Sequence, residues 1–291
     1  MRYALIPGIQ KEVSRLVIGT VLIEPAVWET FVERGGTCFD AAYHYGEEAE
    51  RALGAFVERH GLRERLVIVG KGAHTPTCAP EHVTPQLLAS LDHLRTDYLD
   101  LYLLHRDDLV VPVSEWAHTL HEHVAAGRMR AIGASNWTIE RYEAFNEYAA
   151  RNRLTGFTVL SNQLSLAEVL EPVWTGCLSV FDAASRAWLE RTRTPLLAWS
   201  AQARGFFAGR PEDGEMRASW LSEANLRRRR HAEELAVRLG VPTVAAALAW
   251  VLCQPFPTFA VVGPRSLEEL EACLAALDVE LDEHEHGCLE S

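Results

Sequence analysis

The sequence predicts an α/β fold, a (β/α)8 TIM barrel formed by a single domain over residues 1–291. The chain has 291 residues, of which 48% are hydrophobic, and this is enough for one large barrel core. Short apolar runs that end in polar or glycine residues recur along it. Most successive ends are about thirty residues apart, the length of a strand with its returning helix. These ends lie near Thr20, Asp40, Lys71, His105, Ser135, Gln163, Ser200 and Gly263.

Helical patterns fill the intervals between these runs. Thr84 and Pro85 are a good cap and first-turn pair for a helix with leucines at three-to-four spacing. The stretch 200–263 is longer than one helix requires, so we expect a loop at 205–214 and two helices. The second of these begins after Pro242, and its apolar residues predict a mostly buried helix before the last strand.

Three segments lie outside the repeating pattern. We expect residues 1–13 to form a short cap, of hairpin form, over the closed end of the barrel. Residues 278–291 are expected to be a short C-terminal tail. The segment 167–180 is an insertion after the sixth strand, and we expect it to form a pocket wall together with Trp137 and Phe206.

Composition and charge exclude several classes of partner. The formal net charge is −12, which argues against nucleic acid because phosphate neutralisation needs a clustered positive face. No apolar run reaches the ~18 residues that a membrane span needs. The first fifteen residues lack an apolar core and a small-residue cleavage site, so we expect a cytoplasmic protein. The six cysteines have no paired short spacing, which favours buried thiols over zinc or redox sites.

Four polar residues at run ends have complementary chemistry: Asp40, Tyr45, Lys71 and His105. A tyrosine with pKa ~10 is a poor proton donor at neutral pH, and a neighbouring ammonium such as Lys71 would lower that pKa. Asp40 would keep the lysine charged, since a buried ammonium without a carboxylate tends to lose its proton. His105 would hydrogen-bond a carbonyl oxygen from the other side. The four groups include no electron donor, so a cofactor must provide it.

These residues and several further segments resemble the aldo-keto reductases over about residues 14–277. In that family an Asp, Tyr, Lys and His tetrad lies at the ends of successive barrel strands. Position 41 is alanine where the family usually has threonine. The matching segments, in chain order, are Asp40 to Gly46 (DAAYHYG), Lys71, His105, Gly133 to Asn136 (GASN), Asn162 with Gln163, and Val262 to Ser266 (VGPRS).

The resemblance implies a nicotinamide cofactor held at the strand ends. Ser135, Asn136 and Gln163 would bind its carboxamide, and Trp199, where the family usually has tyrosine, would stack on its ring. An alternative for Trp199 is a core aromatic at a strand end. The remaining implied cofactor residues are Gly19, Thr20 and Gly263 at strand ends, Ser200, Gln202 and Arg204 near the pyrophosphate, and Arg265 and Ser266 at the adenosine phosphate.

Two departures from the family pattern bear on cofactor choice. Glu271 stands where many members have a second arginine, and Cys273 stands where asparagine is common. A carboxylate near a phosphate is repulsive. We therefore expect NADPH as cofactor, with NADH possible.

The resemblance implies NAD(P)H-dependent, reversible reduction of an aldehyde or ketone to an alcohol, without metal. One alternative is a non-catalytic or slowly catalytic nicotinamide-binding regulatory subunit, and another is a metal-dependent barrel hydrolase or lyase. His118, His121 and His123 do not share one helix face, which argues against a metal there. No GxGxxG motif is present, so a Rossmann domain is not expected.

Overall fold

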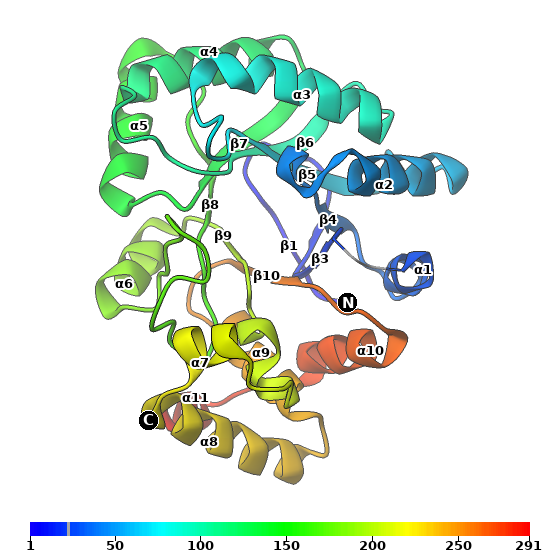
Figure 1. Ribbon diagram of the computed structural model, residues 1–291, viewed down its shortest axis with the longest axis vertical. Helices are drawn as coiled ribbons and strands as arrows, with labels where there is room; N and C mark the ends of the chain where they lie inside the picture. The colour runs from blue at the N-terminus through cyan, green and yellow to red at the C-terminus, as the bar shows by residue number, and fades with distance from the viewer. Residues whose placement is uncertain (22–23) are drawn as a thin grey trace.

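The computed structural model describes residues 1–21 and 24–291, and its centre is a closed barrel of parallel strands (Figure 1). The last strand pairs with both the seventh and the first, which closes the barrel. This confirms the predicted fold. The strands, in spatial order, are β3 (Leu16–Gly19), β4 (Cys38–Asp40), β5 (Val67–Gly72), β6 (Leu99–Leu104), β7 (Met129–Ser135), β8 (Val159–Ser161), β9 (Leu196–Ala198) and β10 (Thr258–Val262).

Helices surround the barrel in Figure 1. The helix expected at Thr84 begins earlier, at Pro80, because a proline in the first turn has no amide hydrogen to satisfy. Between β9 and β10 the structure has four helical segments where we expected two helices. The helical segments are α1 (Pro25–Glu33), η1 (Tyr43–Tyr45), α2 (Glu47–Arg59), α3 (Pro80–Leu94), α4 (Val113–Ala125), α5 (Ile139–Asn152), α6 (Ala183–Thr192), η2 (Ala203–Ala208), α7 (Gly214–Trp220), α8 (Glu223–Leu239), α9 (Thr243–Leu252), α10 (Leu267–Ala275), η3 (Ala276–Asp278) and α11 (Glu283–Glu290).

Side chains alternate between the barrel interior and the helical layer along every strand. In β6, Leu101 and Leu103 belong to the interior cluster, whereas Tyr102 and Leu104 pack toward the helices. The interior set on the other strands has the same two-residue period, as a pleated strand requires. At the C-terminal end of each strand, the residue two positions after the last interior residue therefore points into the open end of the barrel, which we call the mouth.

The N-terminal residues cap the opposite end of the barrel, as predicted. β1 (Tyr3–Ala4) and β2 (Val13–Ser14) pair in antiparallel fashion. Between them, Ile6 and Ile9 are buried and belong to the cluster that fills the barrel interior. The hairpin thus excludes water from that end of the interior cluster.

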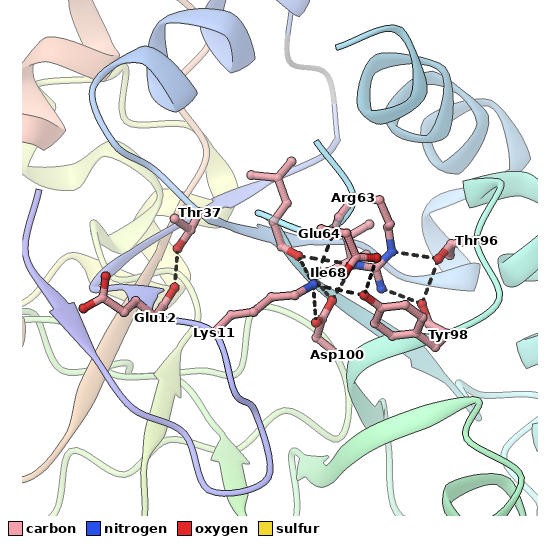
Figure 2. A network of polar contacts seen from close by, with 10 residues as sticks. Lys11, Glu12, Thr37, Arg63, Glu64, Ile68, Thr96, Tyr98 and Asp100 are labelled. Atoms are coloured by element: carbon pink, nitrogen blue, oxygen red, sulfur yellow. Dashed lines mark hydrogen bonds and ion pairs between the residues drawn. The ribbon is translucent and has the colours of Figure 1, made fainter. Parts of the chain in front are cut away.

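A polar network joins this cap to the barrel (Figure 2). Lys11 forms an ion pair of 2.8 Å with Asp100 on β6, and Arg63 contacts the second oxygen of the same carboxylate at 2.8 Å. The guanidinium of Arg63 also lies 3.8 Å from the centre of the Tyr98 ring. A single buried carboxylate therefore holds two cations from different parts of the chain.

The C-terminal residues form a docked helix rather than the short tail that we expected. Asp282 and Glu285 make a capping box that starts α11. Near its end, Leu289 is 1% exposed and Glu290 accepts a hydrogen bond of 3.1 Å from the indole of Trp250. At its start, Glu285 pairs with Arg238 of α8 at 2.8 Å, so both ends of the helix contact the rest of the protein.

Within the described ranges, no single helix has the length and apolar character of a membrane span. Helices α8 and α9 satisfy that test only when taken together, across a bend of 104°.

Candidate active site

The strand alternation brings three of the predicted residues into the barrel mouth. Asp40 ends β4 two residues after the interior residue Cys38, and Lys71 follows the interior residue Val69 on β5. His105 comes two residues after Leu103, immediately beyond β6. The fourth residue, Tyr45, is supplied by the short helix η1, which follows β4.

Asp40 and Lys71 form a buried ion pair. The Lys71 ammonium lies 2.5 Å from Oδ1 of Asp40 and donates a second hydrogen bond of 3.2 Å to the carbonyl of Ala41. Burial alone would lower the pKa of Lys71, but the Asp40 charge and the nearby Tyr45 outweigh it, so this pKa is raised above its usual value. Lys71 is therefore charged, as the sequence chemistry required.

The Tyr45 hydroxyl lies within reach of this pair. It is 3.5 Å from Oδ2 of Asp40, and the Lys71 ammonium is 4.9 Å from the centre of its ring. Our expectation that the pKa of Tyr45 falls was wrong for this structure. Burial, the largest cause, raises that pKa and Asp40 adds to the rise, while Lys71 offsets only part of it. Tyr45 is therefore a neutral phenol near pH 7.

His105 faces Tyr45 across the mouth. The two ring centres are 5.8 Å apart and nearly perpendicular. Burial, together with the charges of Lys71 and Arg106, lowers the pKa of His105 well below its usual value, so the ring is neutral. Its Nδ1 is buried without a hydrogen-bond partner among the described residues. A neutral imidazole in this position can serve as a hydrogen-bonding group for a ligand.

Two further histidines adjoin His105, and the sequence analysis did not single them out. His44 and His74 stack with ring centres 3.6 Å apart, and the His74 ring is 4.8 Å from that of His105. His44 stands next to Tyr45 in the DAAYHYG segment, and His74 lies three residues after Lys71. These short spacings from predicted residues were the signal that could have identified them.

Ser135, Asn136 and Gln163 lie buried at the ends of β7 and β8, and the side-chain amides of Asn136 and Gln163 already have partners. The side chain of Asn136 donates to Ser135 at 3.0 Å and accepts from the backbone amide of Leu178 at 3.1 Å. The oxygen of the Gln163 side chain accepts from the hydroxyl of Ser179 at 2.7 Å. The segment 167–180 thus lies against two of the predicted cofactor residues.

Trp199 follows β9 and is half-buried, and its ring is 5.9 Å from that of Trp174 in the 167–180 segment. The indole nitrogen of Trp199 is buried and has no partner in the described part of the chain. The expected pocket wall is wrong for Trp137 and Phe206, which are 0% and 2% exposed and pack in the core. Their large aromatic rings are better buried against the helices than exposed in a pocket.

The loop after β9 has a constrained backbone. Ser200 and Arg204 both have positive φ values, 49° and 52°. Gln202 donates to the thiol of Cys273 at 3.1 Å, so these two residues, which lie far apart in sequence, are in contact. Arg204 forms an ion pair with Glu215 and lies 4.9 Å from the centre of the Trp174 ring.

The last strand leads into α10, whose first turn differs from our expectation. Ser266 caps the helix, as its position suggested. Glu271, expected near the adenosine phosphate, instead pairs with Arg34 at 2.5 Å because α1 and α10 are in contact. Glu268 and Glu269 both lie in the first turn of this helix, and Glu269 accepts from the backbone amide of Arg265 at 2.8 Å and pairs with Arg210 at 3.0 Å. Sequence reasoning missed Glu269, although its place in an S-x-x-E capping pattern was visible.

The three remaining predicted residues line strand ends around the mouth. Gly19 ends β3 and is paired in register with Asp40, and Thr20 donates to the carbonyl of Asp40 at 3.1 Å. Gly263 follows β10, and an added side chain there would meet nothing within 4 Å. The space beside Gly263 is therefore open.

Comparison with known proteins identifies the family of the chain. Norsolorinic acid reductase stcV of Emericella nidulans is 30% identical over 280 residues, 89% of this chain and 69% of that protein. The 6-dehydroglucose reductase of Agrobacterium fabrum is 27% identical over 296 residues, 93% of this chain and 91% of that protein. A thermostable aldo-keto reductase crystallised with the inhibitor epalrestat has the same fold, with a TM-score of 0.78 at 23% identity and coverage of 100% and 99%. The model of the aldo/keto reductase family matches residues 25–291, and the chain belongs to this family.

Proposed function

We propose that this protein reduces an aldehyde or ketone to an alcohol with NADPH, reversibly and without metal, and that Asp40, Tyr45, Lys71 and His105 perform the proton chemistry. The observation that carries the proposal is the contact of the Tyr45 hydroxyl with the buried Lys71–Asp40 pair, opposite the neutral ring of His105. This arrangement has a proton donor, a charge to stabilise the phenolate and a group to orient a carbonyl.

Each residue has one step in this mechanism. Tyr45 is protonated because burial disfavours its phenolate, so it can donate a proton to the carbonyl oxygen. The Lys71 ammonium stabilises the phenolate that remains after transfer, and Asp40 keeps that ammonium charged and in place. His105 orients the carbonyl oxygen by hydrogen bonding. A bound reduced nicotinamide would supply the hydride, for which the chain has no group of its own.

The residues around the mouth fit such a cofactor. Among the described residues the indole nitrogen of Trp199 has no partner, and the space beside Gly263 is open, which leaves a donor and room at the ends of β9 and β10. Ser135, Asn136 and Gln163 would hold the carboxamide, and Gly19 and Thr20 lie on the adjoining strand end. Ser200, Gln202 and Arg204 would contact the pyrophosphate, and Arg265 and Ser266 the adenosine phosphate. Because Glu269 adds negative charge there, NADH remains a second candidate.

The direct test is the absorbance of NADPH and NADH during incubation with aldehydes, ketones and sugars, in buffer that contains a metal chelator. We expect oxidation of NADPH that depends on the carbonyl compound and is insensitive to the chelator. Binding of the nicotinamide without turnover of any carbonyl would instead favour the regulatory-subunit alternative. Activity that is lost on chelation would favour a metal-dependent enzyme.

A further inference from the structure

Arg106, the residue after His105, is a buried cation that has no counterion among the described residues. It is 7% exposed. Its guanidinium hydrogen-bonds to two neutral groups: Nη1 donates to the carbonyl of His105 at 2.8 Å, and Nη2 donates to the thiol of Cys177 at 3.3 Å. A buried guanidinium ordinarily has a carboxylate partner, because removing a lone charge from water is costly. The charge of Arg106 is thus uncompensated by the part of the chain that the structure describes.

The two carboxylates that follow Arg106 in the chain are engaged elsewhere. Asp107 accepts two hydrogen bonds from the guanidinium of Arg141, at 2.9 and 3.0 Å. Asp108 accepts from the backbone amide of Val110 at 3.0 Å. Neither carboxylate is therefore placed to neutralise the neighbouring guanidinium.

The 167–180 segment covers Arg106 without supplying a negative charge. A Cβ added at Gly176 would lie 4.0 Å from Cδ of Arg106, and Cys177 is itself 7% exposed. Burial raises the pKa of the Cys177 thiol by more than Arg106 lowers it, so the thiol is neutral near pH 7. The segment therefore shields the guanidinium from water and leaves its charge in place.

The backbone at His105 and Arg106 is fixed by the residues that end and follow β7. The side chain of Asn136 donates to the carbonyl of His105 at 3.4 Å, and the indole of Trp137 donates to the carbonyl of Arg106 at 3.2 Å. The guanidinium of Arg106 folds back onto the same carbonyl of His105. The unpaired charge and the imidazole are thus held next to each other.

The groups that act on the His105 ring come from several elements. Burial lowers the pKa of His105 most, and the charge of Lys71 comes next, followed by that of Arg106. The Asp40 carboxylate, 2.5 Å from Lys71, cancels part of the field of that ammonium, whereas Arg106 has no such partner among the described residues. The charged or titratable groups that face or adjoin the ring are Lys71 on β5, His74 after it, His44 and Tyr45 on η1, and Arg106 after β6.

We infer that Arg106 is a positioning residue for the reaction, a buried and unpaired guanidinium that keeps the neighbouring imidazole of His105 neutral. The inference rests on the proposed reduction and adds to it a residue outside the four that perform the proton chemistry. A neutral imidazole leaves Tyr45 as the proton donor of the site. An imidazolium would compete with Tyr45 as a donor and would repel the Lys71 ammonium.

Two charge changes test this inference on His105 itself. Arg106→Gln removes the cation, whereas Cys177→Asp keeps it and places a carboxylate beside it, since Sγ of Cys177 is 3.3 Å from Nη2 of Arg106. In both variants the pKa of His105 should rise by at least ~0.5, because a nearby positive charge is lost or compensated. NMR titration of protein with labelled histidine measures this pKa, and His105→Gln assigns its signal among the 12 histidines.

Matched variants separate charge from packing. Cys177→Asn has the size of the aspartate variant without its charge and should leave the pKa of His105 within ~0.2 of the wild-type value, and Arg106→Lys should restore most of that value. Circular dichroism would verify that each variant folds. An unchanged pKa in folded Arg106→Gln and Cys177→Asp would overturn the inference, and so would an equal rise in Cys177→Asn. A rise in Arg106→Gln that Cys177→Asp does not reproduce would assign the effect to packing and reject the inference.

The pH profile of the reaction gives a second readout. With NADPH and butanal, an uncharged substrate, protonation of His105 should lower kcat/KM on the acid side. In Arg106→Gln and Cys177→Asp this acid limb should move to higher pH by ~0.5 or more, which is about a threefold loss of kcat/KM at a fixed pH on the limb. If Arg106 were only structural, kcat/KM would fall equally at every pH and the limb would not move.

The failure of this inference can be separated from that of the proposed function. If no carbonyl compound is reduced with either nicotinamide, the proposed function fails, and the NMR titration still decides whether Arg106 keeps His105 neutral. If butanal is reduced and the pKa of His105 is the same in all the folded variants, the reaction stands and the role of Arg106 does not.

Discussion

Two lysine–aspartate pairs with buried carboxylates lie at opposite ends of the barrel and differ in how many hydrogen bonds the ammonium makes. Lys11, at the capped end, contacts Asp100 and also donates to the carbonyls of Arg63 and Leu66 and to the hydroxyl of Tyr98 (Figure 2). All the hydrogen-bonding capacity of this ammonium is therefore used by groups of the protein.

Lys71, at the open end, has fewer partners. It contacts Asp40 and the carbonyl of Ala41, and its remaining neighbour is Tyr45. Its charge is therefore still available to a group that becomes negative beside it. The same two residue types thus form a fully hydrogen-bonded structural ion pair at one end of the barrel. At the other end they form a site that can stabilise a new negative charge.

The most severe expected change is in stability, at the capped end. Asp100→Asn removes the carboxylate from two cations, and breaking a buried pair in this way costs about 3 kcal/mol or more in the free energy of unfolding. Urea denaturation measures it. Asp97→Asn, three residues away and exposed, is the control and should change stability by less than ~0.5 kcal/mol. If both variants were equally stable, the ion pairs of Asp100 at the capped end would not contribute to the stability of the fold.

A large change in activity is expected at the open end. Tyr45→Phe removes the proposed proton donor and should lower kcat for carbonyl reduction by at least ~100-fold, with cofactor affinity nearly unchanged. Steady-state kinetics and cofactor titration measure the two quantities. Tyr3→Phe, in the hairpin at the other end, should retain normal turnover. Near-normal activity in Tyr45→Phe would remove the mechanism.

A third carboxylate, Glu269, bears on the choice between NADPH and NADH. It accepts a hydrogen bond from the backbone amide of Arg265 and forms an ion pair with Arg210. A charge-assisted contact to the 2′-phosphate is worth ~1.5–3 kcal/mol, so Arg265→Ala should lower NADPH affinity roughly ten- to a hundredfold and barely affect NADH. Glu269→Gln should raise the preference for NADPH, most clearly at low salt. Glu271→Gln is the control, since Glu271 pairs with Arg34 instead. Equal losses for both cofactors in Arg265→Ala would contradict this assignment.

His105, at the open end, should add to the acid sensitivity of the fold. Burial holds the pKa of His105 well below its ordinary value, so between pH ~6.5 and that lowered pKa the unfolded chain binds a proton that the folded chain does not. Stability should therefore fall as the pH drops below ~6.5. His105→Gln should reduce this dependence by up to ~1.4 kcal/mol per pH unit. Denaturation at pH 7.5, 6.5 and 5.5 measures it, and identical slopes in both proteins would exclude His105 as the source.

The smallest expected effect concerns Trp199. If the nicotinamide stacks on this ring, Trp199→Ala should lose most of the cofactor-induced quenching of tryptophan emission and roughly 1 kcal/mol or more of affinity. Trp174→Ala separates the two neighbouring indoles, whose rings are 5.9 Å apart. Quenching that persists in Trp199→Ala and disappears in Trp174→Ala would assign the contact to the second ring.

The barrel could be predicted from the sequence because the same pattern, a short apolar run that ends in a polar or glycine residue, recurs at every strand. Asp40, Lys71 and His105 could be found for the same reason, since each stands at the end of an apolar run. The raised pKa of Tyr45 could not be predicted, because it depends on how deeply the folded chain buries the hydroxyl. The pairing of Glu271 with Arg34 likewise depends on two helices that meet only in the closed barrel.

Other features were present in the sequence but were not recognised. The Asp282 to Glu285 spacing is a helix-start pattern, and it would have predicted α11 where we expected a tail. Trp137 and Phe206 were expected in a pocket wall, but position along the chain does not specify which side of the backbone a ring occupies. That choice depends on packing against helices distant in sequence.

The two-residue alternation of the strands limits how this barrel can change by insertion or deletion. Adding one residue within β5 ahead of Lys71 would turn its ammonium away from Asp40 and toward the helical layer, and would expose an apolar residue to the mouth. Adding two residues would restore the side on which Lys71 lies, although at a different height. An insertion of any length in a loop such as 167–180 leaves the two faces of each strand unchanged. We therefore expect length variation among natural or engineered variants to be confined to the loops, and specificity to change there while the proton chemistry stays constant.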